Sequence, residues 1–299
     1  MPIGTLGDSY GVRDTHLVEP WVRVPEWEDV PDPIAAWLLN EGGDAPVEYF
    51  SGQPTVLFAD GFGNDMTWQD TPLGPGLGNL DNAGTGGVVI IHDDSDPDIR
   101  FDLLAETFTP GRLSLEFWGQ AINDNFNGGQ PRFIQKGIGA AASQHDWMIG
   151  LSSSQFRARL NTGGSTTTIL GSGALTNQQV YHFVMTYDGA DIRMYEDGVE
   201  VNSAAHTGIV RAQATSDVVM FNTAASGTNT NHYDGVGLKV AVYDYCLTPG
   251  QIGRLFSDPA GRYNAGPNTF MFRAAVAATG VQGPPFSHRR VRGHPSLRM

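Results

Sequence analysis

Two Asp-Gly pairs, at positions 188–189 and 197–198, separate three short runs of aromatic and β-branched residues. The runs are VYHFVMTY (180–187), DIRMY (191–195) and VEVN (199–202). An Asp-Gly pair between alternating runs is among the strongest sequence signals for a β-hairpin, because both residue types suit a tight turn. The segment therefore predicts three consecutive antiparallel strands.

Similar runs, divided by turn residues, continue from Pro33 to about Phe256. We expect further strands at 35–39, 87–91, 113–120, 132–136, 147–151, 155–160, 166–170, 217–222 and 237–245. The stretch 70–86 is rich in glycine and predicts an extended loop. About a dozen short strands at this spacing indicate an all-β fold, an antiparallel sandwich or jelly roll.

One short helix is expected near the C-terminal end of this stretch. Thr248 suits the N-cap and Pro249 the first helical position, and Ile252, Leu255 and Phe256 fall on one face. We expect this helix to cap one open end of the core. Alternation along the strands predicts that the following residues face the core: Trp118, Phe183, Met185, Met194, Val240 and Val242.

Two extended arms flank the predicted domain, which spans residues 34–258. The N-terminal arm, 1–33, carries seven acidic residues against two arginines, and the C-terminal tail, 259–299, carries six arginines and no acid. The N-terminal arm either packs on its own domain or docks on a neighbouring subunit or partner. The C-terminal tail is either a solvated terminus or a segment that docks on the acidic arm of the next subunit. The candidate docking residues are Trp21, Trp27, Arg289, Arg290 and Arg292.

The overall charge and composition exclude several classes of protein. The formal net charge of −14 argues against general nucleic-acid binding, which needs a basic surface. No apolar run approaches the roughly 20 residues needed to span a bilayer. Cys246 is the single cysteine, so no disulfide can form within the chain. The first residues lack the pattern of a secretory signal, so we expect a chain made in the cytoplasm.

Several segments together resemble the laminin-G-like, concanavalin A-like lectin/glucanase jelly-roll family. The segment YHFVMTYDGADIRMYEDGVEV (181–201) resembles its signature pair of hairpins. WLLNEG (37–42), LSLEFWGQ (113–120) and DGVGLKVAVYDYCLTPGQIGRLF (234–256) resemble its opening strand, its Phe-Trp strand, and its closing strand and helix. The resemblance spans residues 37–256 and implies an antiparallel jelly roll. Residues 43–100 depart from it, since they are longer and richer in glycine than the family's short strands.

No motif in the sequence points to catalysis. Laminarinase-like members of this superfold carry Glu-x-Asp-x-Glu on one strand, so that alternate carboxylates face the cleft. That motif does not occur here, and Glu116 is the lone acid of its strand. A Gly-x-Ser-x-Gly elbow, a phosphate loop and zinc-ligand spacing are also missing from the sequence. We therefore expect a non-enzymatic protein.

An acidic run, HDDSDPD (92–98), is the candidate metal site. It places Asp93, Asp94, Asp96 and Asp98 within seven residues, and calcium prefers such oxygen ligands. Resemblance to laminin-G-like modules adds to this, since many of them hold calcium at the sandwich rim. A solvated acidic loop is the alternative.

A carbohydrate site needs aromatic rings and planar polar groups on exposed loops. The candidates are Trp68, Trp147, Asn229, Asn231, His232 and Tyr233. Four of them belong to the polar segment 223–235, which is long enough for a binding loop. The alternative is a polar connection without a ligand.

These observations favour a virion structural protein of a bacteriophage, such as a capsid decoration, head fibre or tail-associated protein. Laminin-G-like domains usually belong to secreted proteins, and a virion protein explains how one can lack a signal, because it assembles in the host cytoplasm. Arms of opposite charge suit a homo-oligomer or docking on other virion proteins. Host surface glycans are a further expected partner. The alternatives are a cellular, extracellular carbohydrate-binding lectin and, third, a glycoside hydrolase.

Overall fold

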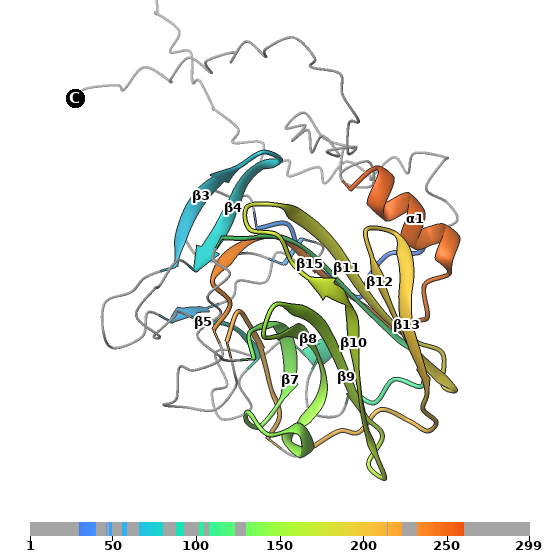
Figure 1. Cartoon of the computed structure of the whole chain (residues 1–299). Helices are drawn as coiled ribbons and strands as arrows, with labels where there is room; N and C mark the ends of the chain where they lie inside the picture. Colours follow the sequence, from blue (N-terminus) through green and yellow to red (C-terminus); the bar gives the residue numbers. More distant parts are fainter. Residues whose placement is uncertain are drawn as a thin grey trace, which may run out of the picture.

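The computed structural model describes residues 30–39, 46, 48–49, 56–58, 66–79, 88–92, 102–104, 108–122, 130–213, 215–222 and 232–259. These residues form two antiparallel β-sheets, one α-helix and two short 3-10 helices, Asp102–Leu104 and Ala142–Gln144 (Figure 1). The predicted antiparallel β-sandwich with one short helix is confirmed.

The first sheet has the strand order β13-β12-β11-β6-β15-β4-β3, and β1 pairs with the end of β15 that β4 leaves free. Its strands are β1 (Ala35–Trp37), β3 (Thr67–Thr71), β4 (Gly74–Asn79), β6 (Leu113–Ala121), β11 (Val180–Tyr187), β12 (Asp191–Glu196), β13 (Val199–Ala205) and β15 (Gly235–Tyr243).

The second sheet has the order β10-β9-β8-β7-β14-β5-β2. Its strands are β2 (Val56–Phe58), β5 (Val88–His92), β7 (Arg132–Gly137), β8 (His145–Ser152), β9 (Gln155–Asn161), β10 (Thr166–Ala174) and β14 (Asp217–Met220). β7 to β10 follow one another in the chain and in the sheet, because short turns connect them.

Both Asp-Gly pairs form the predicted turns between β11, β12 and β13. Asp197 and Gly198 both have positive φ angles, 48° and 83°, as a tight hairpin turn between twisted strands requires. At the first turn the Asp188 carboxylate accepts hydrogen bonds from the backbone N–H groups of Ala190 and Asp191, each at 2.8 Å. Local sequence thus fixes the register of these three strands.

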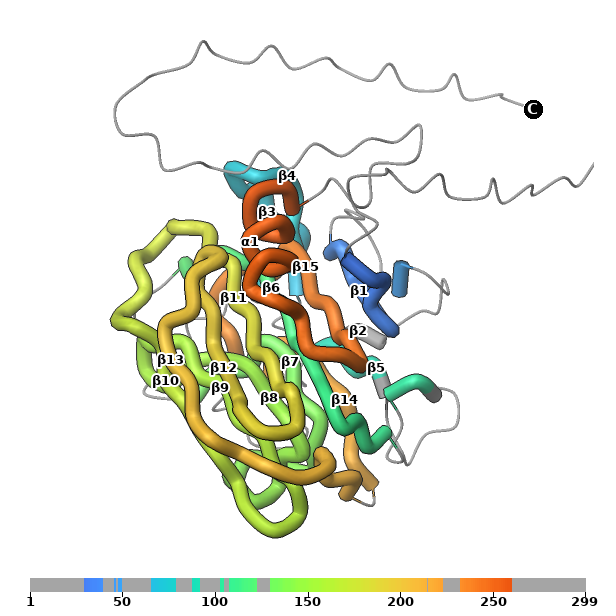
Figure 2. The backbone as a smooth tube through the Cα atoms, turned by 90° about the vertical axis from the view of Figure 1, so that its right-hand side faces the viewer, coloured from blue at the N-terminus to red at the C-terminus, as the bar shows by residue number. Residues whose placement is uncertain are grey.

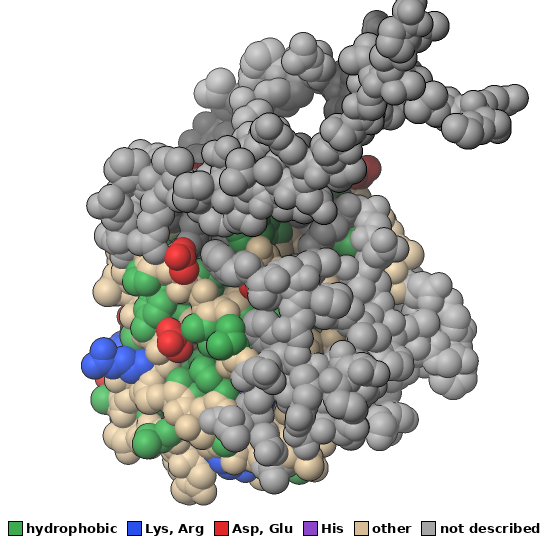
Figure 3. Space-filling view, turned by 180° about the vertical axis from the view of Figure 1, so that it is seen from behind, with side chains coloured by type: hydrophobic (Ala, Val, Ile, Leu, Met, Phe, Trp, Pro, Cys, Tyr) green, Lys and Arg blue, Asp and Glu red, His purple; other side chains and the backbone are tan. Residues whose placement is uncertain are grey.

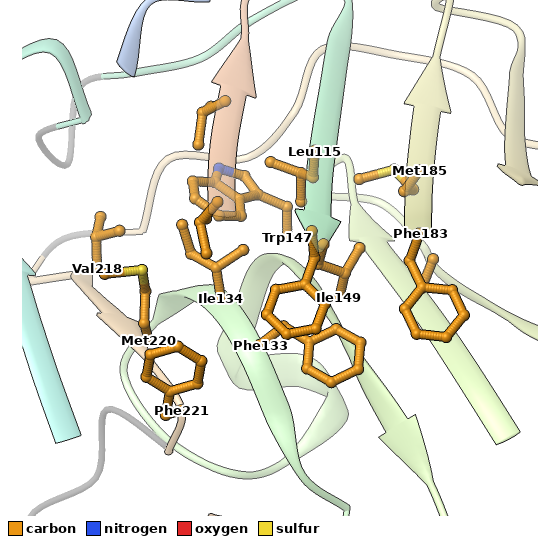
Figure 4. Packing of buried hydrophobic residues seen from close by; sticks show 14 of the residues in the cluster. Leu115, Phe133, Ile134, Trp147, Ile149, Phe183, Met185, Val218, Met220 and Phe221 are labelled. Atoms are coloured by element: carbon orange, nitrogen blue, oxygen red, sulfur yellow. The ribbon is translucent and has the colours of Figure 1, made fainter. Parts of the chain in front are cut away.

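Aromatic rings from the inner faces of the two sheets fill the core (Figure 4). Phe117 of β6 stacks on Phe133 of β7 with ring centroids 3.9 Å apart. Phe183 of β11 stacks on Phe156 of β9 at 4.1 Å. Trp147 of β8 lies among them and is fully buried. Contacts of this kind across the sheets hold the sandwich together, since each ring buries a large apolar area.

The outer face of the first sheet is covered by α1 (Pro249–Ser257). Thr248 caps the helix and Pro249 begins it, as predicted. The buried residues Ile252 and Leu255 pack on outward-facing residues of β11, β12 and β15. Figure 2 shows α1 lying against this sheet. The expectation that the helix caps an open end of the core is therefore wrong, because its apolar stripe matches a sheet face.

Trp118 corrects a second expectation about this sheet. Five of the six residues predicted to face the core do so, but Trp118 lies on the outer face with Leu73 and Leu238. Its ring stacks on Phe256 of α1 at 5.9 Å between centroids. Its neighbour Phe117 takes the core position, since successive residues of a strand point to opposite faces.

Two strands, β3 and β4, occupy part of the stretch that was expected to be a loop. β4 reads GPGLGN, with glycine at alternate positions. A Cβ atom on Gly76 would lie 2.5 Å from Cγ1 of Val236 and 2.7 Å from the carbonyl oxygen of Gly237. Glycine thus permits β4 to approach β15 closely, although it removes the side chains by which a strand is recognised.

The described surface seen from behind is mixed in character (Figure 3). Hydrophobic side chains lie beside acidic ones there, and basic side chains appear toward the edges. Within the described ranges, no helix is both long and apolar enough to cross a membrane.

Candidate functional site: an arginine cluster on the second sheet

Two of the described residues that the sequence proposed for carbohydrate binding are closed to any ligand. Trp147 and Tyr233 are core residues, 0% and 2% exposed, so neither ring has a face that a sugar could reach. The Tyr233 ring packs edge-on against Phe133 at 4.9 Å. His232 is also buried, whereas Trp68 of β3 is half-buried at the edge of the first sheet.

The remaining candidates lie outside the described residues, so they stay predictions. They are Asn229, Asn231, Asp93, Asp94, Asp96, Asp98, Trp21, Trp27, Arg289, Arg290 and Arg292. Within the described ranges, no group of three or more His, Cys, Asp or Glu side chains could hold a metal ion. The predicted calcium ligands lie within residues 93–98, outside the described ranges, so this observation does not test the calcium prediction.

Three arginines share the outer face of β7, β8 and β9. The inner face of β9 holds Phe156, Ala158 and Leu160, so alternation turns Arg157 and Arg159 outward. Arg132 of β7 joins them and, with His145 at the start of β8, they form the arginine cluster. All four residues are at least 93% buried.

Gly150 of β8 brings two of these arginines together. It pairs in register with Arg132 on one side and with Arg157 on the other. A Cβ atom here would lie 2.9 Å from Cα of Arg132 and closer still to the carbonyl oxygen of Pro131. The missing side chain permits the close approach of β7 to β8, with Arg132 and Arg157 on either side of the same residue.

The arginine cluster donates its hydrogen bonds to neutral acceptors. Arg132 donates to the Gln135 side chain at 3.1 Å and to backbone carbonyls of Gln130 and Ala140. Arg157 donates to the side-chain and backbone oxygens of Gln130.

Arg159 completes this set with two neutral partners. It donates from Nε to the Thr168 hydroxyl at 2.9 Å, and its Nη1 lies 2.9 Å from Nδ1 of His145. None of the three guanidinium groups forms an ion pair with a carboxylate of the described residues.

Other arginines of the domain are neutralised by acids. Arg193 of β12 forms ion pairs with Asp188 at 2.6 Å and Asp191 at 2.7 Å. Arg211 pairs with the buried Asp146 at 2.9 Å. The arginines of the cluster thus differ from Arg193 and Arg211 in that no described carboxylate pairs with them.

Burial and mutual repulsion both oppose the positive charges of the arginine cluster. Burial, together with the charges of Arg157 and Arg159, lowers the pKa of Arg132 to about 8. Burial and Arg159 lower the pKa of Arg157 to about 9. Burial and the three guanidinium groups lower the pKa of His145 to about 2. Because arginine holds its proton even when buried, these shifts express unbalanced positive potential.

A second polar cluster lies under α1 on the first sheet and is closed to solvent. The Glu116 carboxylate is fully buried and accepts hydrogen bonds from Lys239 at 2.7 Å, Tyr243 at 2.6 Å and Trp118 at 3.2 Å. Nε2 of His182 lies 3.2 Å away. Burial opposes ionisation, but Lys239 and His182 outweigh it and hold the pKa of Glu116 well below its ordinary value.

This second cluster links strands and offers no catalytic pair. Glu116, His182 and Lys239 come from β6, β11 and β15, which are neighbours in the sheet. Among the described residues the Glu116 carboxylate contacts Lys239, His182, Tyr243 and Trp118 and no second carboxylate, whereas glycoside hydrolysis ordinarily needs two at a defined separation.

Sequence reasoning missed the arginine cluster, although a signal was present. The motif RAR (157–159) on a predicted strand places two arginines on one face, since side chains alternate. The contribution of Arg132 depends on the pairing of β7 with β8, which no local pattern reveals.

Comparison with known proteins agrees with the fold. The sequence profile of a family described as the concanavalin A-like lectin/glucanases superfamily matches residues 92–253. No curated protein has a sequence that matches this chain.

Three solved structures illustrate the structural likeness. The binding domain of botulinum neurotoxin serotype G superimposes with a TM-score of 0.52 at 10% identity, over 75% of this chain and 50% of that one. The binding domain of botulinum neurotoxin DC, solved with rat synaptotagmin II, gives 0.50 at 14%, over 78% and 52%. Trypanosoma rangeli sialidase gives 0.50 at 16%, over 76% and 33%. The chain spans about half or less of these relatives, and such low identities show the fold alone.

Proposed function

The chain belongs to the concanavalin A-like lectin/glucanases superfamily, and from this premise we propose that it is a non-catalytic module that binds glycans on a receptor surface. Two of the structurally similar proteins are toxin binding domains, which supports a binding role. The experiment that tests this proposal measures whether the full chain binds glycans and leaves them uncleaved.

The contrast between the two sheet faces carries this proposal. On the first sheet, the buried carboxylate of Glu116 lies beneath α1, and its oxygens accept hydrogen bonds from Lys239, Tyr243 and Trp118. On the second sheet, the arginine cluster adjoins the exposed residues Thr168 and Gln130. The buried arginines therefore adjoin residues that solvent reaches, whereas the three hydrogen-bond donors to Glu116 are themselves buried.

We further propose that the chain is a structural protein of a virion, in which this module contacts the host. The support comes from the sequence, because an acidic segment 1–33 and a basic segment 259–299 flank the module. Opposite charges favour docking of one subunit's arm on the next. A cellular lectin is the alternative, and it needs no such assembly.

Light scattering on the full chain distinguishes these two settings. Assembly through the arms predicts a defined oligomer at low salt that dissociates as salt screens the charges. The variant with Arg289, Arg290 and Arg292 all changed to Gln should dissociate at lower salt. A monomer under every condition would contradict self-assembly and favour the lectin alternative.

A further inference from the structure

We propose that the arginine cluster binds the anionic group of an acidic glycan, a carboxylate or a sulfate carried on a sugar. This rests on the proposed function and names the class of glycan. The site consists of Arg132, Arg157 and Arg159, with Gln135 and Thr168 beside them.

The first argument is that donors on this face lack acceptors. Nε of Arg157 and Nε2 of Gln135 are both buried and have no hydrogen-bond partner in the protein. A buried donor without an acceptor destabilises the fold, so such atoms are rare in stable proteins. Arg132 connects these two residues, since it donates to Oε1 of Gln135 and shares Gln130 with Arg157. An oxyanion accepts several such bonds at once.

The second argument is charge. The three guanidinium groups come from β7 and β9, the two strands that flank β8, and their partners are amide, hydroxyl, imidazole and carbonyl groups. A carboxylate or sulfate forms shorter and stronger bonds with arginine than neutral oxygens do, and it removes the repulsion between the arginines. Arg193 and Arg211 show that this chain supplies acids where an arginine only supports the fold.

The third argument is access. Gln130 precedes β7 and is exposed, and its side-chain oxygen accepts from Arg157. A ligand that displaces this oxygen reaches the arginines from solvent. On the other side, β10 pairs with β9 and turns Thr166, Thr168 and Leu170 to the same outer face, where all three are exposed. Hydroxyls next to an apolar side chain suit a sugar ring better than they suit a bare ion.

Calorimetric titration of the full chain tests the assignment directly. The probes are sialyllactose, a uronic-acid oligosaccharide and a sulfated oligosaccharide, with lactose as the neutral reference. We expect at least one acidic probe to bind at least tenfold more tightly than lactose, and to weaken as salt rises. Equal affinity for acidic and neutral probes would overturn the assignment and leave the proposed glycan binding standing. Failure to bind any glycan would overturn both.

Variants place the binding on this face. Arg159→Gln should lower the affinity for the acidic probe at least tenfold, and Arg159→Lys should lower it less. Arg193→Gln removes one positive charge from the other sheet and should leave the affinity unchanged. Thermal melting checks that each variant is folded. Equal effects of Arg159→Gln and Arg193→Gln would contradict the site. An acidic peptide that binds more tightly than every acidic glycan would also contradict it.

Discussion

Nη1 of Arg159 lies 2.9 Å from Nδ1 of His145, across the two neighbouring strands β8 and β9. A guanidinium can only donate, so Nδ1 must accept and the imidazole proton belongs on Nε2. The contact therefore requires a neutral His145, in agreement with the lowering of its pKa to about 2 by burial and by the arginines. His145 therefore adds no charge to the arginine cluster at physiological pH.

A neutral His145 makes the fold sensitive to acid. In the unfolded chain this residue takes up a proton near its ordinary pKa of 6.5, whereas the folded protein resists protonation down to about pH 2. The free energy of unfolding should therefore decrease as pH falls below 6.5, by about 1.4 kcal/mol per pH unit from this residue. Urea denaturation between pH 6.5 and 4.5 gives the free energy of unfolding as a function of pH. Its slope should be smaller for His145→Gln than for the unchanged protein, by about 1.4 kcal/mol per pH unit. Identical slopes for the two proteins would contradict the assignment.

The buried carboxylate under α1 should matter for stability. Glu116→Gln removes the charge that balances the Lys239 ammonium 2.7 Å away, inside a region without solvent. We expect the free energy of unfolding to fall by about 3–5 kcal/mol, as measured by chemical denaturation. Glu200→Gln is the matched control, because Glu200 is exposed on β13, and it should change stability by about 0.5 kcal/mol or less. Similar losses in both variants would refute the role given to Glu116.

Close approach of β4 to β15 should make Gly76 intolerant of a side chain. Gly76→Ala places a methyl group against Val236 and the backbone of Gly237, at distances that require the strands to move. We expect a loss of about 1–3 kcal/mol in the free energy of unfolding. Gly173→Ala in β10 is the control, since nothing lies within 4 Å of the added atom there. A tolerant Gly76 would mean that the two strands can separate at little cost.

The sequence was a good guide where local signals decide the structure. Asp197-Gly198 dictates a turn by its own backbone preferences, and Thr248-Pro249 begins a helix by capping it. Trp118 shows the limit of this reasoning. Either Trp118 or the adjacent Phe117 could face the core. Alternation does not decide between them, because α1 covers the outer face of the sheet and makes that face apolar as well.

The candidate site was harder to predict than the fold. Trp147 and Tyr233 looked like sugar platforms by residue type, but the sheet pairing places both rings inside the sandwich. Conversely, Arg132 and Arg157 lie 25 positions apart in the sequence and meet only because each pairs with Gly150. Sites built across strands depend on register, which a single sequence specifies only in part.

The most direct test of the proposed function is a display of immobilised neutral and acidic glycans exposed to the full chain, followed by mass analysis of the same glycans. Binding without catalysis predicts that the protein is retained on a subset rich in acidic sugars and that every glycan keeps its original mass. A chain that is retained on no glycan, or that shortens the glycans it meets, would contradict the account.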